Sequence, residues 1–81
     1  MAPMMTTLDD LLARRERLRR LPEPRIRRLL RERAGLSQGD LADVLGVDRA
    51  AISRYESGNR SPRPAIAERY LDVLDRLAAE R

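Results

Sequence analysis

The sequence predicts an all-α protein, a compact bundle of about five helices formed by 81 residues. Three observations support this fold class. Apolar residues recur at helical spacing along most of the chain. Capping residues, prolines and glycines divide that pattern into short segments. The hydrophobic fraction of 42% is typical of a folded chain, and a chain of this length is expected to bury one modest core.

The leading segment predicts a helix that is additional to the rest of the bundle. We expect Met1 to Met5 to be frayed and Thr7 to cap a helix that runs to about Leu21. We therefore divide the chain into residues 1–23, a flexible start with this extra helix, and residues 24–81, the main domain. The apolar stripe of the extra helix consists of Leu8, Leu11, Leu12, Leu18 and Leu21.

A second helix is predicted from Pro24 to about Ala34. The two prolines at 22 and 24 disfavour helix in the residues before them, and Pro24 suits the first position of a new helix. Gly35 is placed to end that helix. The side chains expected to face inward are those of Ile26, Leu29 and Leu30.

The segment from Ser37 to Gly58 predicts two short helices joined by a tight turn. Ser37 is a good N-cap with Asp40 as its capping-box partner. Gly46 supplies the positive φ that the turn between the helices requires. Asp48 then caps a helix over residues 49–57, which Gly58 closes.

The last helix is predicted from about Pro64 to about Glu80, after a loop of about six residues. We assign Ile66, Tyr70 and Leu74 to the core. Leu71 and Ala78 lie on a flank that would meet a partner, and Leu77 would serve either side. In the alternative, the leading helix covers the whole stripe within one chain, through Leu8, Leu11, Leu12 and Leu18.

Small and apolar residues in the two-helix segment carry a family resemblance. Ala42, Gly46 and Ile52 stand at the fifth, ninth and fifteenth positions of a twenty-residue window that begins at Gln38. Each has a steric role: Ala42 is small where the two helices cross closely, Gly46 makes the turn, and Ile52 packs the second helix onto the first. With the exit Glu-Ser-Gly-Asn-Arg at 56–60, the segment resembles the helix-turn-helix of the phage-repressor-like (XRE, Cro-type, lambda-repressor-like) DNA-binding domains.

The resemblance covers Pro24 to about Leu77 and departs from the family pattern at both ends. Many family members have a fifth helix after the fourth. This chain instead carries the extra helix in front, which we expect to cover the apolar surface that the fifth helix would otherwise bury.

The resemblance implies a sequence-specific binder of double-stranded DNA that regulates transcription, with the helix at about 49–57 in the major groove. It also implies that Glu56 pairs with Arg31. Gln38 would bond a phosphate, and Asn59 and Arg60 would bind backbone beyond the helix. The residues that would face base edges are Arg49, Ala50, Ser53 and Arg54.

The charge is distributed unevenly along the chain. All 17 basic residues are arginine, which can bind phosphate and guanine with two hydrogen bonds. Residues 1–33 carry net +5 and residues 34–81 net −1, but the stretch 49–63 is locally +3. The arginines of the leading helix are interpreted either as a basic arm on DNA backbone or, as we prefer, as a solvated face.

Other functions remain open at the level of the sequence. The alternatives are an antitoxin, whose extra helix holds a toxin, and an accessory DNA-binding protein of phage recombination. Because cysteine and histidine are absent, we expect no enzyme activity, no cofactor and no metal. We expect a cytoplasmic, bacterial or phage-encoded protein, since no signal peptide or membrane span is evident.

A homodimer on an inverted repeat is the expected assembly. One recognition helix covers too few base pairs for specificity against a genome. Two-fold pairing requires half-sites about one helical turn, roughly 34 Å, apart. A protein partner bound through the leading helix is a further possibility.

Overall fold

The computed structural model describes residues 6–80 and contains five α-helices and no strand within them. The expected frayed start, Met1 to Met5, lies outside the described residues. No helix of the described part is long and apolar enough to cross a membrane. The all-helical prediction is therefore confirmed, and the helices are α1 (Leu8–Leu18), α2 (Pro24–Arg33), α3 (Gln38–Leu45), α4 (Arg49–Ser57) and α5 (Pro64–Ala79).

Side-chain caps fix the starts of α1, α3 and α4 where the sequence predicts them. The Ser37 hydroxyl accepts a hydrogen bond from the Asp40 amide at 2.9 Å, and the Asp40 carboxylate accepts one from the Ser37 amide at 2.8 Å. The bond from the Ser37 backbone holds the pKa of Asp40 below its usual range. A similar box joins Thr7 and Asp10 at the start of α1. The α1 helix nevertheless ends at Leu18, one turn before the predicted Leu21.

Gly46 and Gly58 form the two turns that position α4. Gly46 has φ of 70°, and the following Val47 amide donates to the Ala42 carbonyl at 3.0 Å. Gly58 has φ of 80°, and the Arg60 amide returns to the Arg54 carbonyl at 3.3 Å. A side chain at either position would strain the backbone. Both ends of α4 are therefore held by hydrogen-bonded turns.

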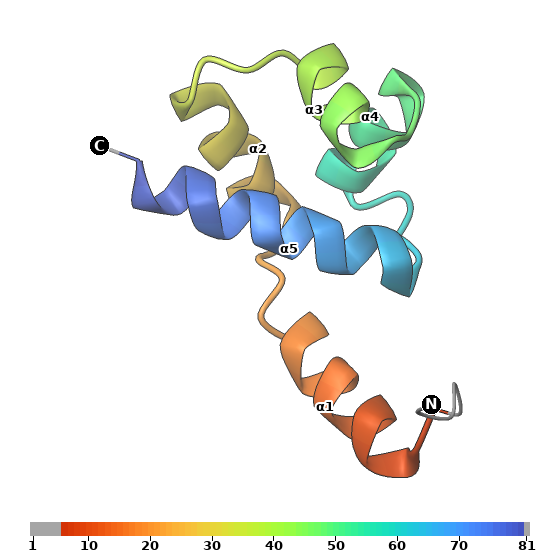
Figure 1. Ribbon diagram of the computed structural model, residues 1–81. Coiled ribbons are helices and arrows are strands. Elements are labelled where there is room, and N and C mark those ends of the chain that lie inside the picture. The colour runs from red at the N-terminus through yellow and green to blue at the C-terminus, as the bar shows by residue number, and fades with distance from the viewer. Residues whose placement is uncertain (1–5, 81) are drawn as a thin grey trace.

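The core lies where α3, α4 and α5 meet, with α2 packed on α4 and α5. Figure 1 shows α5 crossing the middle of the molecule, with α2, α3 and α4 on one side and α1 on the other. The assignment of Ile66, Tyr70 and Leu74 to the core is confirmed. The largest side chains that are fully buried are Tyr70, Leu41, Leu45, Ile52 and Leu74.

Two apolar residues lie where the sequence did not place them. Leu71, expected on a flank open to a partner, is only 5% exposed; it lies outside the main core cluster, on the helix that α1 also contacts. Ala78 is exposed and Leu77 is half-buried. Leu29, expected inside, is exposed. Its place on the inner side of α2 is taken by Arg31, which is buried because its guanidinium has partners inside.

The α1 helix packs on α5 as expected, but three of the four α1 leucines expected to cover α5 are exposed. Leu8, Leu11 and Leu12 are 70%, 49% and 47% exposed, and α1 contributes no buried residue. Leu18 is half-buried, and the main packing contacts of α1 are with α5.

Charged side chains hold α1 instead. Arg17 pairs with Glu68 at 2.7 Å, Arg14 with Glu68 at 3.5 Å and Arg20 with Asp75 at 3.2 Å. The hydrogen bond from Arg17 lowers the pKa of Glu68. These acidic side chains on α5 attract the arginine-bearing side of α1, which leaves much of the leucine stripe in solvent.

Candidate nucleic-acid interface

The α4 helix has one buried and one exposed side, divided as the sequence predicts. Ala51, Ile52 and Tyr55 are buried against the rest of the bundle. The exposed side chains are those of Arg49, Ala50, Ser53 and Arg54. Since Ala50 and Ser53 are small, the centre of this surface offers close approach to a flat or concave partner.

A buried ion pair fixes α4 to α2. Arg31 donates from Nε to Glu56 Oε2 at 2.6 Å and from Nη2 to Glu56 Oε1 at 2.9 Å. Its remaining Nη1 donates to the Leu36 carbonyl at 2.8 Å. The hydrogen bond to Glu56 raises the pKa of Arg31. The pairing implied by the resemblance is thus confirmed, and it links α2, the α2–α3 turn and α4.

Gln38 extends the same network to the start of α3. Its side-chain Nε2 donates to Glu56 Oε1 at 3.2 Å. A glutamine amide has a second N–H and a carbonyl oxygen, so this bond leaves hydrogen-bonding capacity at the half-buried surface. The Gln38 side chain is therefore held beside α4 by Glu56, the same glutamate that fixes α4 to α2.

A second arginine of α2 points inward and stabilises the end of α4. Arg27 donates to the Pro22 carbonyl at 2.6 Å and to the Tyr55 carbonyl at 3.2 Å, and its guanidinium lies 5.6 Å from the centre of the Tyr70 ring. Burial lowers the pKa of Arg27. This arginine is committed to the fold rather than to the exposed surface.

One cationic groove lies between α4 and the start of α3. We call it the α3 groove; its volume is about 610 Å³ and its lining residues are Arg28, Arg31, Ser37, Gln38, Gly39 and Arg49. A smaller hollow of about 300 Å³ adjoins it, because Gln38 and Arg49 line both, and continues past Ala50 to Ser53. The first N–H groups of α3 lie at this groove, and helix starts attract anions.

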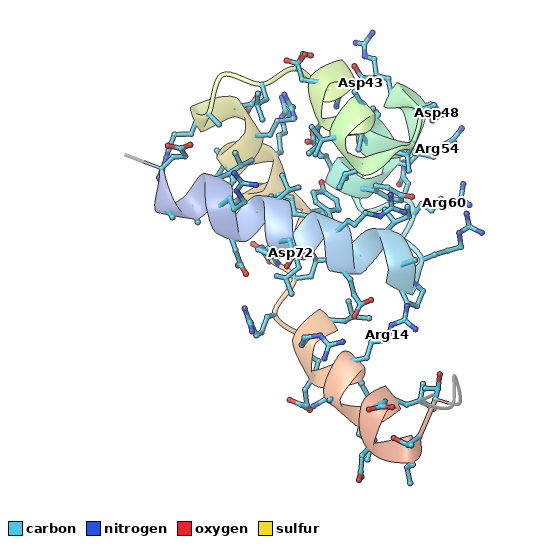
Figure 2. The ribbon with its side chains drawn as sticks, viewed as in Figure 1. Arg14, Asp43, Asp48, Arg54, Arg60 and Asp72 are labelled. Carbon is cyan, nitrogen blue, oxygen red and sulfur yellow. The ribbon has the colours of Figure 1, made fainter. Side chains whose placement is uncertain are left out.

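A second cationic groove lies along the other flank of α4. We call it the loop groove; its volume is about 270 Å³, and Arg54, Arg60 and Arg63 line it together with Asp48. Figure 2 shows Arg54 and Arg60 on the α4 side of α5 and Arg14 on the opposite side. Arginines therefore flank the exposed surface of α4 on both sides.

The candidate residues divide between the two grooves. Gln38, Arg49, Ala50 and Ser53 gather at the α3 groove and its hollow, whereas Arg54 and Arg60 line the loop groove. Asn59 is exposed just after α4 but lines neither groove.

Two arginines at these grooves are not among the residues that were predicted from the sequence to contact DNA. Arg28 lines the α3 groove and Arg63 the loop groove. Arg28 precedes Arg31 by one helical turn, a spacing that places both on one side of α2. That spacing is the signal in the sequence that points to Arg28. Among residues 6–80 there is no cluster of side chains suited to hold a metal ion.

Comparison with known proteins gives consistent similarities. The chain is 64% identical over 31 residues to a protein of Methanoregula boonei that is named as an HTH-type transcriptional regulatory protein. This match covers 38% of the present chain and 10% of that protein. It is 44% identical over 45 residues to an uncharacterized HTH-type transcriptional regulator of Archaeoglobus fulgidus, a match that covers 56% of this chain and 20% of that protein. A protein of Pyrococcus abyssi, also named as an HTH-type transcriptional regulatory protein, is 41% identical to this chain over 46 residues. The match covers 57% of this chain and 15% of that protein.

The matched regions are small parts of these relatives, at most a fifth of their length. No solved structure matches the chain. The sequence profile of the helix-turn-helix domain matches residues 28–81, which include α3, α4 and α5. The chain therefore belongs to the helix-turn-helix domain family.

Proposed function

We propose that this chain binds double-stranded DNA with sequence preference and regulates transcription, with α4 in the major groove. The observation that carries the proposal is the exposed surface of α4, narrow at its centre and flanked by two arginine-lined grooves. Family membership supports it, as do the names of relatives that contain the same domain.

The two grooves match the surroundings of a helix in the major groove. That groove is about 12 Å wide and admits one α-helix between two phosphate backbones. Arg28, Gln38 and the start of α3 are placed to meet one backbone, and Arg60 and Arg63 the other. Asn59, next to Arg60, would add a backbone contact. Phosphate contacts on both sides would set the depth and register of α4.

Base readout is assigned to the side chains on α4 itself. Arg49 and Arg54 have guanidinium groups that suit the O6 and N7 acceptors of guanine. Ala50 is suited to contact a thymine methyl group. The Ser53 hydroxyl can donate a hydrogen bond to a base edge or accept one from it, so it suits either kind of base pair. Each good bidentate contact discriminates by about 1–3 kcal/mol.

The test is selection of bound sequences from a random duplex library, followed by affinity measurements. Arg49→Ala or Arg54→Ala should each cost about 1–3 kcal/mol at one base pair and relax the preference there. Arg76→Ala is the matched control, since Arg76 is exposed near the C-terminal end of α5, away from α4. Equal losses on selected and random DNA for both variants would reduce these arginines to phosphate contacts.

Salt dependence tests DNA binding itself. With about four phosphates neutralised per chain, the plot of log K against log salt should have a slope near −0.9 times that number. Gln38→Ala should weaken binding to all sequences alike and leave the slope nearly unchanged, since glutamine is uncharged. An affinity that is insensitive to salt would refute the DNA-binding function.

We also propose that two copies bind an inverted repeat. A single α4 covers only a few base pairs, and two-fold pairing doubles the length that is read. An antitoxin with a disordered toxin-binding segment is less well supported, because α1 begins with a capping box and is ion-paired to α5.

A further inference from the structure

We propose that α1 is a self-association surface, which pairs in antiparallel orientation with α1 of a second copy of the chain. This inference rests on the dimer of the proposed function and names the surface that forms it. It replaces the flank of α5 as the interface, because Leu71 is buried within the chain.

Three of the four leucines of α1 are not buried by the fold of their own chain. Leu8, Leu11 and Leu12 are exposed and stand three and four residues apart, so they form one continuous apolar strip on the helix. The other large exposed apolar residues of the described part, Leu29 and Val44, lie singly on α2 and α3. A strip of this kind on one surface helix is typical of an interaction site.

The groove beside the strip extends the apolar surface toward α5. It has a volume of about 500 Å³; Leu11, Leu18 and Pro64 contribute its apolar lining, and Arg14, Arg15 and Arg19 line it as well. No α1 residue is buried, so a partner helix would meet this surface without any rearrangement of the core.

The charges of α1 select an antiparallel copy of itself as the partner. The acidic residues Asp9 and Asp10 lie in the first turn, and the second half of α1 and the residues after it carry five arginines. Parallel pairing would place like charges together, whereas antiparallel pairing places each acidic start against a basic end.

Two of these charges have no ion-pair partner in the part of the chain that the structure describes. Among residues 6–80, no ion pair involves Asp9 or Arg15. If Leu11 and Leu12 of two copies meet at the centre of an antiparallel pair, Asp9 of each copy lies beside Arg15 of the other. The unpaired charges and the exposed leucines are thus satisfied by the same arrangement.

The size and place of α1 define the kind of dimer. A helix of 11 residues buries less than the roughly 1,200–2,000 Å² of a stable interface, so the association is weak and reversible. Because α4 lies across α5 from α1 (Figure 1), the two recognition helices stand at the outer ends of the pair.

The test is sedimentation equilibrium of the whole chain without DNA, from micromolar to millimolar concentration. The wild-type chain should show a reversible monomer–dimer equilibrium, and Leu8→Ser with Leu12→Ser should raise the dissociation constant at least about tenfold. Leu29→Ser is the matched control, because Leu29 is 51% exposed and the substituted Leu12 47%. Circular dichroism checks that α1 remains helical in each variant.

Charge exchange tests the antiparallel arrangement. Asp9→Arg and Arg15→Asp should each be monomeric alone, but a mixture of the two variants should form a heterodimer, since both cross-pairs are then of opposite charge. A monomeric wild-type chain, a Leu29→Ser variant that dissociates equally, or a mixture that stays monomeric would overturn the proposal.

DNA binding is measured separately, so that failure of the dimer and failure of the proposed function are distinguishable. The Leu8→Ser, Leu12→Ser variant should retain its salt-dependent affinity for a single half-site. The Arg49→Ala variant should retain the wild-type dimer.

Discussion

The α1 and α2 helices are both rich in arginine and leucine and both pack on α5, but their arginines are used in opposite ways. Arg27 and Arg31 of α2 point inward, where backbone carbonyls and Glu56 receive their hydrogen bonds. The arginines of α1 and of the residues just after it pair with carboxylates of α5 at the surface, and most leucines of α1 remain in solvent. The partner surface, rather than the composition of a helix, decides which of its sides is buried.

The difference has consequences for stability. Exposed ion pairs contribute about 0.2–1 kcal/mol each, whereas removing one member of a buried pair costs about 3–5 kcal/mol. We therefore expect α2 to unfold only with the core and α1 to detach locally at much lower free energy.

The largest expected effect comes from breaking the buried pair of α2. Glu56→Ala should lower the free energy of unfolding by about 3–5 kcal/mol, because Arg31 is left buried without its counter-charge. The control is the double variant Arg31→Met, Glu56→Leu, which should lose much less because both charges are removed. Urea unfolding measures both. If Glu56→Ala lowers the free energy of unfolding by less than about 1 kcal/mol, the Arg31–Glu56 pair contributes no more than an exposed ion pair does.

A smaller effect of opposite sign is expected at Tyr70. Its side chain is fully buried, and its hydroxyl has no hydrogen-bond partner among residues 6–80. Burial raises the pKa of Tyr70 to about 12. Tyr70→Phe should therefore be neutral or raise the free energy of unfolding by up to about 1 kcal/mol, since an unsatisfied polar group is removed. A loss of stability in urea unfolding would show that the hydroxyl contributes a hydrogen bond.

The smallest expected effect is the pH dependence of the attachment of α1. The pKa of Glu68 is lowered in the folded chain, so its contribution is present above the unfolded value of about 4.3 and is lost as the pH falls through the folded value. Glu68→Gln should reduce amide-exchange protection in α1 at neutral pH.

The difference from wild type should vanish on acidification, once Glu68 is protonated in the wild-type chain. Asp72→Asn is the matched control on α5, because no ion pair of the described part involves Asp72. Equal effects of the two substitutions would show that the attachment of α1 does not depend on the Arg17–Glu68 pair.

The local features of the fold were predictable from the sequence, and the arrangement of distant segments was not. Ser37, Gly46 and Asp48 act on neighbours within a few residues, so the starts of α3 and α4 follow from local chemistry. The orientation of α1 depends on Arg17 and Glu68, which are 51 residues apart. No periodicity within α1 reveals that contact, and the leucine stripe predicts the opposite orientation.

The residues of the candidate site likewise divide into those that could be predicted from the sequence and those that depend on the packing of distant segments. The exposed side of α4 follows from helical periodicity alone, and the buried Arg31–Glu56 pair was implied by the family resemblance. The flanking roles of Arg28 and Arg63 required the packing of α2 and of the α4–α5 loop around α4. That Gln38 shares Glu56 with Arg31 depends on three segments meeting at one carboxylate.

The most direct test of the whole account is an NMR titration of the ¹⁵N-labelled chain with a duplex that carries a single selected half-site, so that only one copy binds, following every backbone amide. We predict the largest shifts at the start of α3, along the exposed side of α4 and at Asn59 and Arg60, with α1 unaffected by DNA. Shifts concentrated in α1, or spread evenly over the arginines of both helices, would contradict the assignment of DNA binding to α4 and its two grooves.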